Sequence, residues 1–188
     1  TVQNGRCNGG SSCSEGAGIY NAATLTINNT TISGNAASSK GAGIYNSGTL
    51  AVTNSTFANN TLGLAGDGGG IYNNTGSTTI ANCTFSSNTA NNGGGVYNNT
   101  GATLNVTNCT FSANIGNVNG GGIYNIGTLN LKNSILANSS GGRDCYGTVG
   151  TANNNLLEGP TEVCGLSTGH IIGQDPKLDV LTSYTGYT

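Results

Sequence analysis

The chain has 188 residues, of which only 6% are charged, and Gly, Asn, Thr and Ser take much of the place that charged residues hold in ordinary domains. With five Lys and Arg and a formal net charge of -2, it cannot form an electrostatic surface for nucleic acid or anionic membrane, so we expect neither partner. No apolar run approaches the roughly 20 residues of a membrane span, and no signal-peptide pattern opens the chain, so we expect no membrane insertion and a mature terminus at Thr1.

A six-residue block recurs along the chain. It reads GAGIYN at 16–21 and 41–46, GGGIYN at 68–73 and 120–125, and GGGVYN at 93–98, so that successive tyrosines are 25, 27, 25 and 27 residues apart. Each block is followed by an alternating segment such as TLTI at 24–27, which indicates a strand with one buried face. A corner asparagine and a second short strand come next; the corner residues are Asn29, Asn54, Asn82, Asn108 and Asn133. We expect three strands of about four residues in each repeat, and no helix.

Stacking is the way for such a repeat to bury its apolar side chains, because one flat coil has no second layer. The sequence therefore predicts an all-β, right-handed parallel β-helix of about five to six triangular coils, each of 25–27 residues. Leu25, Leu50, Leu104 and Leu129 should form one inner column, and the asparagines that follow the tyrosines should bond to one another. A structural ladder is also expected from the second strand and its turn: Phe57, Phe85, Phe111, Asn35, Asn60, Asn88 and Asn114.

The glycine-rich block and the later F-x-x-N element together resemble the repeats of the chlamydial polymorphic outer membrane proteins and related secreted bacterial β-helix proteins. Phe57 with Asn60, Phe85 with Asn88 and Phe111 with Asn114 match F-x-x-N, whereas Leu136 with Ser139 departs from it; the resemblance covers about residues 16–139. The glycine block departs too, because it reads GAG or GGG instead of GGA. The resemblance implies a surface-exposed adhesive or structural role and transfers no catalytic residue.

The ends differ from the middle, and we divide the chain into an N-terminal cap (1–15), the β-helix repeats (16–142) and a C-terminal cap or tail (143–188). Two disulfides are expected in these caps, between Cys7 and Cys13 and between Cys145 and Cys164, and they indicate an oxidising, extracellular setting. Zinc is disfavoured because there is no paired CxxC and only one histidine, so we expect no metal and no cofactor. Cys83 and Cys109 share a column in which the spacing is too long for a disulfide, and they should be free buried thiols.

Catalysis is not expected. The charges of the repeats, Lys40, Asp67 and Lys132, with Glu15 at the entrance, are taken to occupy different coil positions, so no pair of carboxylates would be aligned. Asp175 and Asp179 are interpreted as part of a solvated cap, and no Ser, Cys or Asp near His170 in the sequence suggests a catalytic triad.

Two outer faces are candidate binding surfaces. One is a flat ladder of hydroxyl side chains that could order water and bind ice, although threonine also suits any exposed strand position; its residues are Thr31, Thr56, Thr84 and Thr110. The other is an exposed tyrosine column containing Tyr45, Tyr72 and Tyr97, which could stack on sugars or could only pack between coils. Matches to N-x-S/T such as 54–56 and 108–110 fall on corner asparagines that we expect to be buried, so we interpret them as incidental.

The sequence thus favours a secreted, non-enzymatic structural or adhesive solenoid of a bacterial surface or extracellular matrix, with glycans or a neighbouring cell surface as possible partners. The alternatives are an ice-binding protein and a carbohydrate-binding β-helix without evident catalytic residues. Because the first and last coils present strand edges, we also expect self-association into a head-to-tail filament, bridged by residues 1–6 or by the tail that carries Tyr184 and Tyr187.

Overall fold

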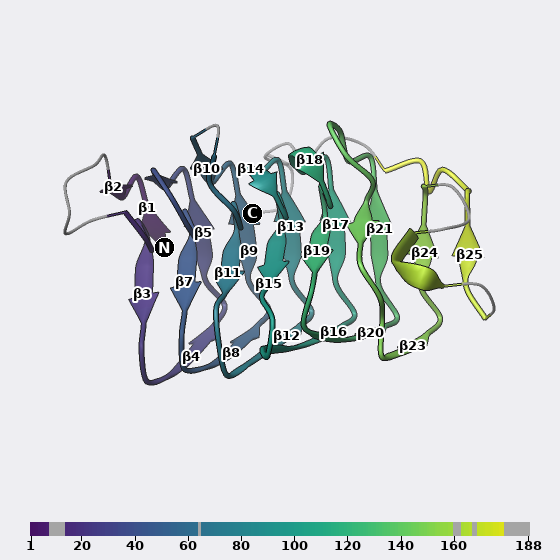
Figure 1. The fold of residues 1–188 in the computed structure, drawn as a ribbon, viewed down its shortest axis with the longest axis horizontal. Coiled ribbons are helices and arrows are strands. Elements are labelled where there is room, and N and C mark those ends of the chain that lie inside the picture. The colour runs from purple at the N-terminus through teal and green to yellow at the C-terminus, as the bar shows by residue number, and fades with distance from the viewer. Residues whose placement is uncertain (8–13, 64, 160–162, 167–168, 179–188) are drawn as a thin grey trace, which may run out of the picture.

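The chain forms an elongated parallel β-solenoid whose sheets run along the axis of the stack, and one of them, sheet A, extends furthest toward the C-terminal end (Figure 1). The structure is a computed structural model that describes residues 1–7, 14–63, 65–159, 163–166 and 169–178. Its strands belong to four parallel sheets, and a short 3-10 helix, η1 (Val163–Gly165), lies near the C-terminal end. The expected fold class is confirmed. Among the described residues, no helix has the length and apolar character that a membrane crossing needs.

Each sheet is built from one strand of each successive coil that it crosses. Sheet A contains β1 (Val2–Gln3), β5 (Thr31–Ser33), β9 (Thr56–Ala58), β13 (Thr84–Ser86), β17 (Thr110–Ser112), β21 (Ile135–Ala137), β24 (Leu156–Leu157) and β25 (Ile171–Ile172). Sheet B, which ends earliest, contains β2 (Arg6–Cys7), β6 (Ala36–Ala37), β10 (Thr61–Leu62), β14 (Thr89–Asn92) and β18 (Ile115–Asn119). Sheet C contains β3 (Ile19–Asn21), β7 (Ile44–Asn46), β11 (Ile71–Asn73), β15 (Val96–Asn98), β19 (Ile123–Asn125) and β22 (Cys145–Tyr146). Sheet D contains β4 (Thr24–Asn28), β8 (Thr49–Thr53), β12 (Ser77–Ala81), β16 (Thr103–Thr107), β20 (Thr128–Lys132) and β23 (Thr151–Asn153).

The prediction of three strands per repeat is wrong, because a complete coil has four. The additional strand belongs to sheet B and is only two residues long in β6 and β10. A segment that short shows no alternation of apolar and polar residues, which is the signal that identifies a strand in a sequence.

The interior is filled by columns of like side chains, as the repeat predicts. The strands of sheet D place Leu25, Leu50, Thr78, Leu104 and Leu129 in one register, which confirms the leucine column. Thr78 takes the place of a leucine in the third coil, where its hydroxyl donates to the Asn73 side chain at 2.8 Å and accepts from Asn46 at 3.1 Å. A buried hydroxyl is tolerated there because it is fully hydrogen-bonded.

The glycines of the repeated block have two separate tasks. The first glycine of each block has a positive φ, between 59° at Gly41 and 75° at Gly68, which a side chain rarely adopts. The third glycine allows coils to approach: a Cβ on Gly95 would lie 2.4 Å from the Gly122 carbonyl oxygen and 2.9 Å from a ring carbon of Phe111. The block therefore turns a corner and then passes directly beneath the next coil.

The expected ladder of asparagines is confirmed. The F-x-x-N residues are completely buried, and each Nδ2 donates to the Oδ1 of the next: Asn35 to Asn60 at 2.9 Å, Asn60 to Asn88 at 2.9 Å, and Asn88 to Asn114 at 3.0 Å. The asparagines that follow the tyrosines form a second buried ladder, with Nδ2 to Oδ1 distances of 2.7–3.0 Å from Asn21 to Asn125.

The corner asparagines were expected to be buried, and this expectation is wrong. All five have a positive φ of 48–55° and exposed side chains. Four of them form a third amide ladder on the outside of the solenoid, namely Asn54, Asn82, Asn108 and Asn133, and Asn54 continues it to Asn28. Burial therefore gives no reason to call the N-x-S/T matches incidental. A left-handed corner residue points its side chain away from the core, and a sequence does not show on which side of a turn a side chain lies.

Both ends continue the sheets. β1 and β2 pair with β5 and β6, and β22, β23 and β24 extend sheets C, D and A past residue 142. Cys145 and Cys164 form a disulfide that ties η1 to β22. Cys83 and Cys109 are free and buried, as expected. Cys7 is buried, but its expected partner Cys13 lies outside the described residues, as do Asp179, Tyr184 and Tyr187.

Candidate functional site

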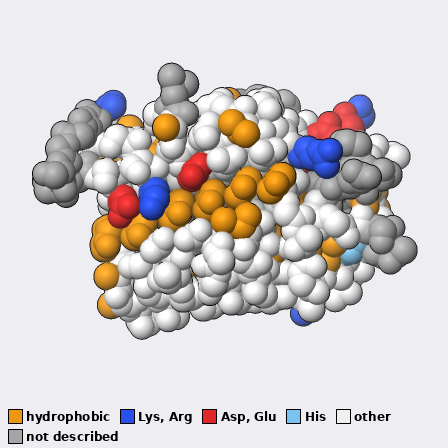
Figure 2. Space-filling model, in the orientation of Figure 1, with side chains coloured by type: hydrophobic (Ala, Val, Ile, Leu, Met, Phe, Trp, Pro, Cys, Tyr) orange, Lys and Arg blue, Asp and Glu red, His pale blue; other side chains and the backbone are white. Residues whose placement is uncertain are grey.

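The most distinctive outer surface is the face of sheet C, where six tyrosines stack in register from β3 to β22. Neighbouring ring centroids are 4.6–5.6 Å apart and their planes differ by 4–16°; the pairs are 20–45, 45–72, 72–97, 97–124 and 124–146. We call these six residues the tyrosine ladder. Figure 2 shows a band of hydrophobic side chains that crosses the face formed by these strands.

The expectation of an exposed tyrosine column holds only at the ends. Tyr45, Tyr72 and Tyr97 are at most 9% exposed, whereas Tyr20 is 57% and Tyr146 is 40% exposed. Each inner ring has a neighbour on both faces, so it presents only its edge to the surface. Sugars stack on aromatic faces, and the inner tyrosines therefore cannot bind a glycan in that way.

A row of charged residues runs beside the tyrosine ladder. The backbone forms isolated parallel β-bridges between successive coils at these positions, from Glu15 to Lys40, from Lys40 to Asp67 and from Asp67 to Asn92. The Lys40 ammonium is 3.8 Å from a Glu15 carboxylate oxygen and 5.1 Å from the Tyr72 ring centroid. Asp67 Oδ1 accepts from the backbone N–H and the Nδ2 of Asn92 at 3.1 and 2.9 Å.

The prediction that the charges of the repeats occupy different coil positions holds for Lys132, which lies in β20, and is wrong for Glu15, Lys40 and Asp67. Glu15, Lys40 and Asp67 each stand directly before the first glycine of a block, and this shared position in the repeat is the signal that could have aligned them. Their polar atoms largely satisfy one another within the row. We call Glu15, Lys40, Asp67 and Asn92 the charged row.

The charged row and the burial of the rings both act on the phenols. Burial, and next the Asp67 carboxylate, raises the pKa of Tyr97 from 10.0 to about 12. Burial likewise raises the pKa of Tyr72, with further contributions from Tyr97 and Asp67. The phenols of Tyr72 and Tyr97 thus keep their protons under conditions in which free tyrosine ionises.

We expect this shift to make the protein lose stability in strong base. The unfolded chain releases the Tyr97 proton near pH 10 and the folded chain near pH 12, so the contribution is complete below pH 10 and is lost as the pH rises through this interval. The measurement is urea unfolding between these pH values, with phenolate absorbance as a second signal. Tyr97→Phe should weaken the dependence on pH, and an unchanged dependence in that variant would contradict the assignment to Tyr97.

The threonine face of sheet A has the expected register. Thr31, Thr56, Thr84 and Thr110 are successive partners, followed by Ile135. A second row of residues, two positions after each threonine, passes from Ser33 through Ala58 and Ser86. Ser86 and Ala137 of this row are buried. The two rows therefore do not form a continuous open surface of hydroxyl groups.

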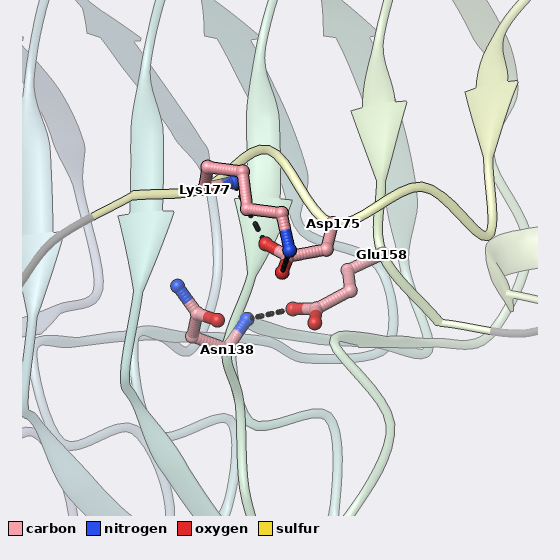
Figure 3. A network of polar contacts seen from close by, with 4 residues as sticks. All are labelled: Asn138, Glu158, Asp175 and Lys177. Carbon is pink, nitrogen blue, oxygen red and sulfur yellow. Dashed lines mark hydrogen bonds and ion pairs between the residues drawn. The ribbon is translucent and has the colours of Figure 1, made fainter.

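A second group of charges gathers near the C-terminal end, beside a groove of about 490 Å³ that Asp144 and Glu158 help to line. Asp144 is buried, its two oxygens accept from the backbone N–H groups of Ser139 and Gly159, and burial raises its pKa. Glu158 accepts from the Asn138 N–H, and the Lys177 ammonium lies 2.7 Å from Asp175 Oδ2 (Figure 3). Both groove carboxylates are thus committed to backbone donors at turns, which is a structural role.

His170 also has a structural contact, because its Nδ1 accepts the Asn155 N–H at 3.2 Å. It lines an open groove of about 590 Å³ with Leu156 and Ile171. No group of three His, Cys, Asp or Glu side chains within the described part of the chain could hold a metal ion.

The fold defines a parallel β-solenoid whose outer faces carry the ladders described above. The family model described as "Right handed beta helix region" matches residues 2–157, and the chain belongs to this family. A comparison with curated proteins returned no match, and a comparison with solved structures also returned none.

Proposed function

We propose that the protein is an extracellular structural or adhesive solenoid that acts without catalysis and associates with further copies of itself through its N-terminal end. The adhesive role rests on the resemblance of the repeats to those of the chlamydial polymorphic outer membrane proteins, and the extracellular setting on the Cys145–Cys164 disulfide. The observation that carries the association is the incomplete burial of the first coil.

Side chains at equivalent positions are less buried in the first coil than in the second. Ile44, Leu50 and Tyr45 are buried in the second coil, whereas Ile19 and Leu25 are only partly buried and Tyr20 is 57% exposed in the first. Among the described residues, β3 and β4 have a strand partner on one side only. One more coil in register would bury these side chains and pair these edges, and the C-terminal coil of a second copy carries Tyr146 and Cys145 at the positions of the tyrosine and isoleucine columns.

Residues 1–6 pair with their own chain along one strand edge. β1 pairs with β5, and Arg6 of β2 pairs with β6 of its own chain. We propose that the association uses the edge of β3 and β4, where the partly buried side chains lie, together with the edges of β1 and β2 that have no strand partner among the described residues.

We expect the protein to associate end to end at high concentration and to form fibres whose axial repeat matches one stack of coils. Sedimentation velocity and electron microscopy measure this. Tyr20→Lys should leave a monomer, because lysine on an edge strand opposes edge pairing. The matched control is Thr79→Lys, an exposed position in the middle of sheet D. A wild-type protein that stays monomeric, or a closed dimer without fibres, would contradict the filament.

Ice binding is the alternative for the threonine face, and we expect no thermal hysteresis from the purified protein. The reason is that Ala58 and Ile135 interrupt the two rows of this face and that Ser86 and Ala137 are buried. Hysteresis that disappears in Thr84→Tyr would establish ice binding on this face and overturn the structural assignment.

A further inference from the structure

The tyrosine ladder connects the two ends of sheet C through an unbroken series of ring contacts. Its six rings are held parallel, and no gap between neighbouring centroids exceeds 5.6 Å. We propose that the tyrosine ladder is a redox relay, in which an oxidising equivalent taken up at one end ring, Tyr20 or Tyr146, passes through the stack to the other.

Phenols suit this task because each can lose one electron and one proton and form a neutral radical. The inner rings are shielded from solvent and the end rings are open, so soluble oxidants and radical acceptors have access mainly to Tyr20 and Tyr146. Carboxylates of the charged row lie close enough to the stack to affect its phenols, Glu15 at Tyr45 and Asp67 at Tyr97. At the exposed end ring, Tyr20, the proton that oxidation releases goes to water.

Each step of the relay couples the transfer of one electron to the transfer of one proton. A one-electron outer-sphere oxidant removes an electron from Tyr20, and its phenol proton leaves, so that a phenoxyl radical remains. In each relay step the radical gains an electron and a proton, while the next tyrosine loses an electron and a proton and becomes the radical. At Tyr146 the radical can couple with a phenoxyl of another molecule: a bond forms between two ring carbons, and the two ring hydrogens move as protons to the two phenolic oxygens, which restores both aromatic rings.

The buried phenylalanine ladder shows that stacking alone does not make a relay. The Phe57, Phe85 and Phe111 rings are 4.5 and 4.7 Å apart, as close as the tyrosines. They have no phenol proton to release and are completely buried. This ladder is therefore an internal control with similar geometry and different chemistry.

The test places the oxidant at one end and detects the radical at the other. A ruthenium(II) polypyridyl complex is attached to Ala22→Cys, an exposed position near Tyr20, and photo-oxidised with hexaammineruthenium(III) as electron acceptor. The background carries Cys83→Ser and Cys109→Ser, which the repeat tolerates because Ser55 and Ser134 occupy the same column, and Tyr184→Phe with Tyr187→Phe. Radicals are captured with a nitroso spin trap, and the adducts are located by peptide mass spectrometry.

We expect an adduct at Tyr146, its loss in Tyr72→Phe, and its retention in Phe85→Leu of the buried ladder. Tyr72→Phe keeps a ring in the stack and removes only the hydroxyl group, so its effect reports the chemistry and not a change of fold. Adducts confined to Tyr20 and Tyr45 in the starting protein would overturn the relay, as would an undiminished Tyr146 adduct in Tyr72→Phe. The relay is independent of end-to-end association, because the experiment uses dilute monomer.

Discussion

Phe85→Ala should lower the free energy of unfolding by about 3–5 kcal/mol, which is the usual cost of removing a fully buried phenylalanine. Phe85 is completely buried, and its ring is stacked between Phe57 and Phe111 at centroid distances of 4.5 and 4.7 Å. The substitution leaves a cavity, and it also removes the partner from one face of each neighbouring ring. In a solenoid each coil contacts only its neighbours, so the surrounding structure cannot collapse from many directions to fill the space.

Chemical denaturation followed by both circular dichroism and intrinsic tyrosine fluorescence measures this effect, because two probes reveal whether the coils unfold together. Phe85→Leu keeps part of the volume and should cost clearly less. Thr84→Ala, the adjacent outward residue of β13, should change the free energy by no more than about 0.5 kcal/mol. If Phe85→Ala also changed the free energy of unfolding by only about 0.5 kcal/mol, the phenylalanine ladder would not support the stack.

Asn88→Ala should be similarly damaging, with a loss of at least about 3 kcal/mol, because several buried polar groups lose their partners together. Asn88 Oδ1 accepts from the backbone N–H of Asn60 at 3.1 Å and from its Nδ2 at 2.9 Å. Its Nδ2 donates to the Phe57 carbonyl oxygen at 2.9 Å and to Asn114 Oδ1 at 3.0 Å. All of these groups are buried, and water cannot replace the missing amide without a cavity to hold it.

The exposed corner ladder provides the matched control. Asn108 also has a link to the preceding coil, from its Nδ2 to Asn82 Oδ1 at 3.2 Å, but both side chains are exposed. Asn108→Gly keeps the positive φ of 54° accessible and leaves only solvated groups without a partner, so we expect a change within about 0.5 kcal/mol. Equal losses in the two variants would show that burial is not what makes the F-x-x-N ladder important.

These ladders explain how a chain with few charges can form a stiff element. Three amide ladders, the phenylalanine ladder and the tyrosine ladder all run along the solenoid axis, so each coil is joined to the next by side chains as well as by strand hydrogen bonds. Stiffness along the axis is what a structural or adhesive element needs, and it is the property that the proposed association would extend.

The fold class, the inner leucine column and the F-x-x-N asparagine ladder could all be predicted from the amino-acid sequence. This is possible because the repeat places like residues at like positions, and parallel in-register stacking then brings Leu50, Leu104 and Asn88 to their partners without further information. The alternation of apolar and polar residues also settles which side chains of a strand face the core.

The arrangement of residues outside the strands could not be predicted in this way, because a turn residue has no alternation to show the direction of its side chain. The path of each turn exposes the corner asparagines, adds the short strands of sheet B, and aligns Glu15, Lys40 and Asp67 beside the tyrosines. The covering of the inner tyrosine faces is likewise a result of stacking distance, since rings held about one strand spacing apart exclude solvent from every face except those at the two ends.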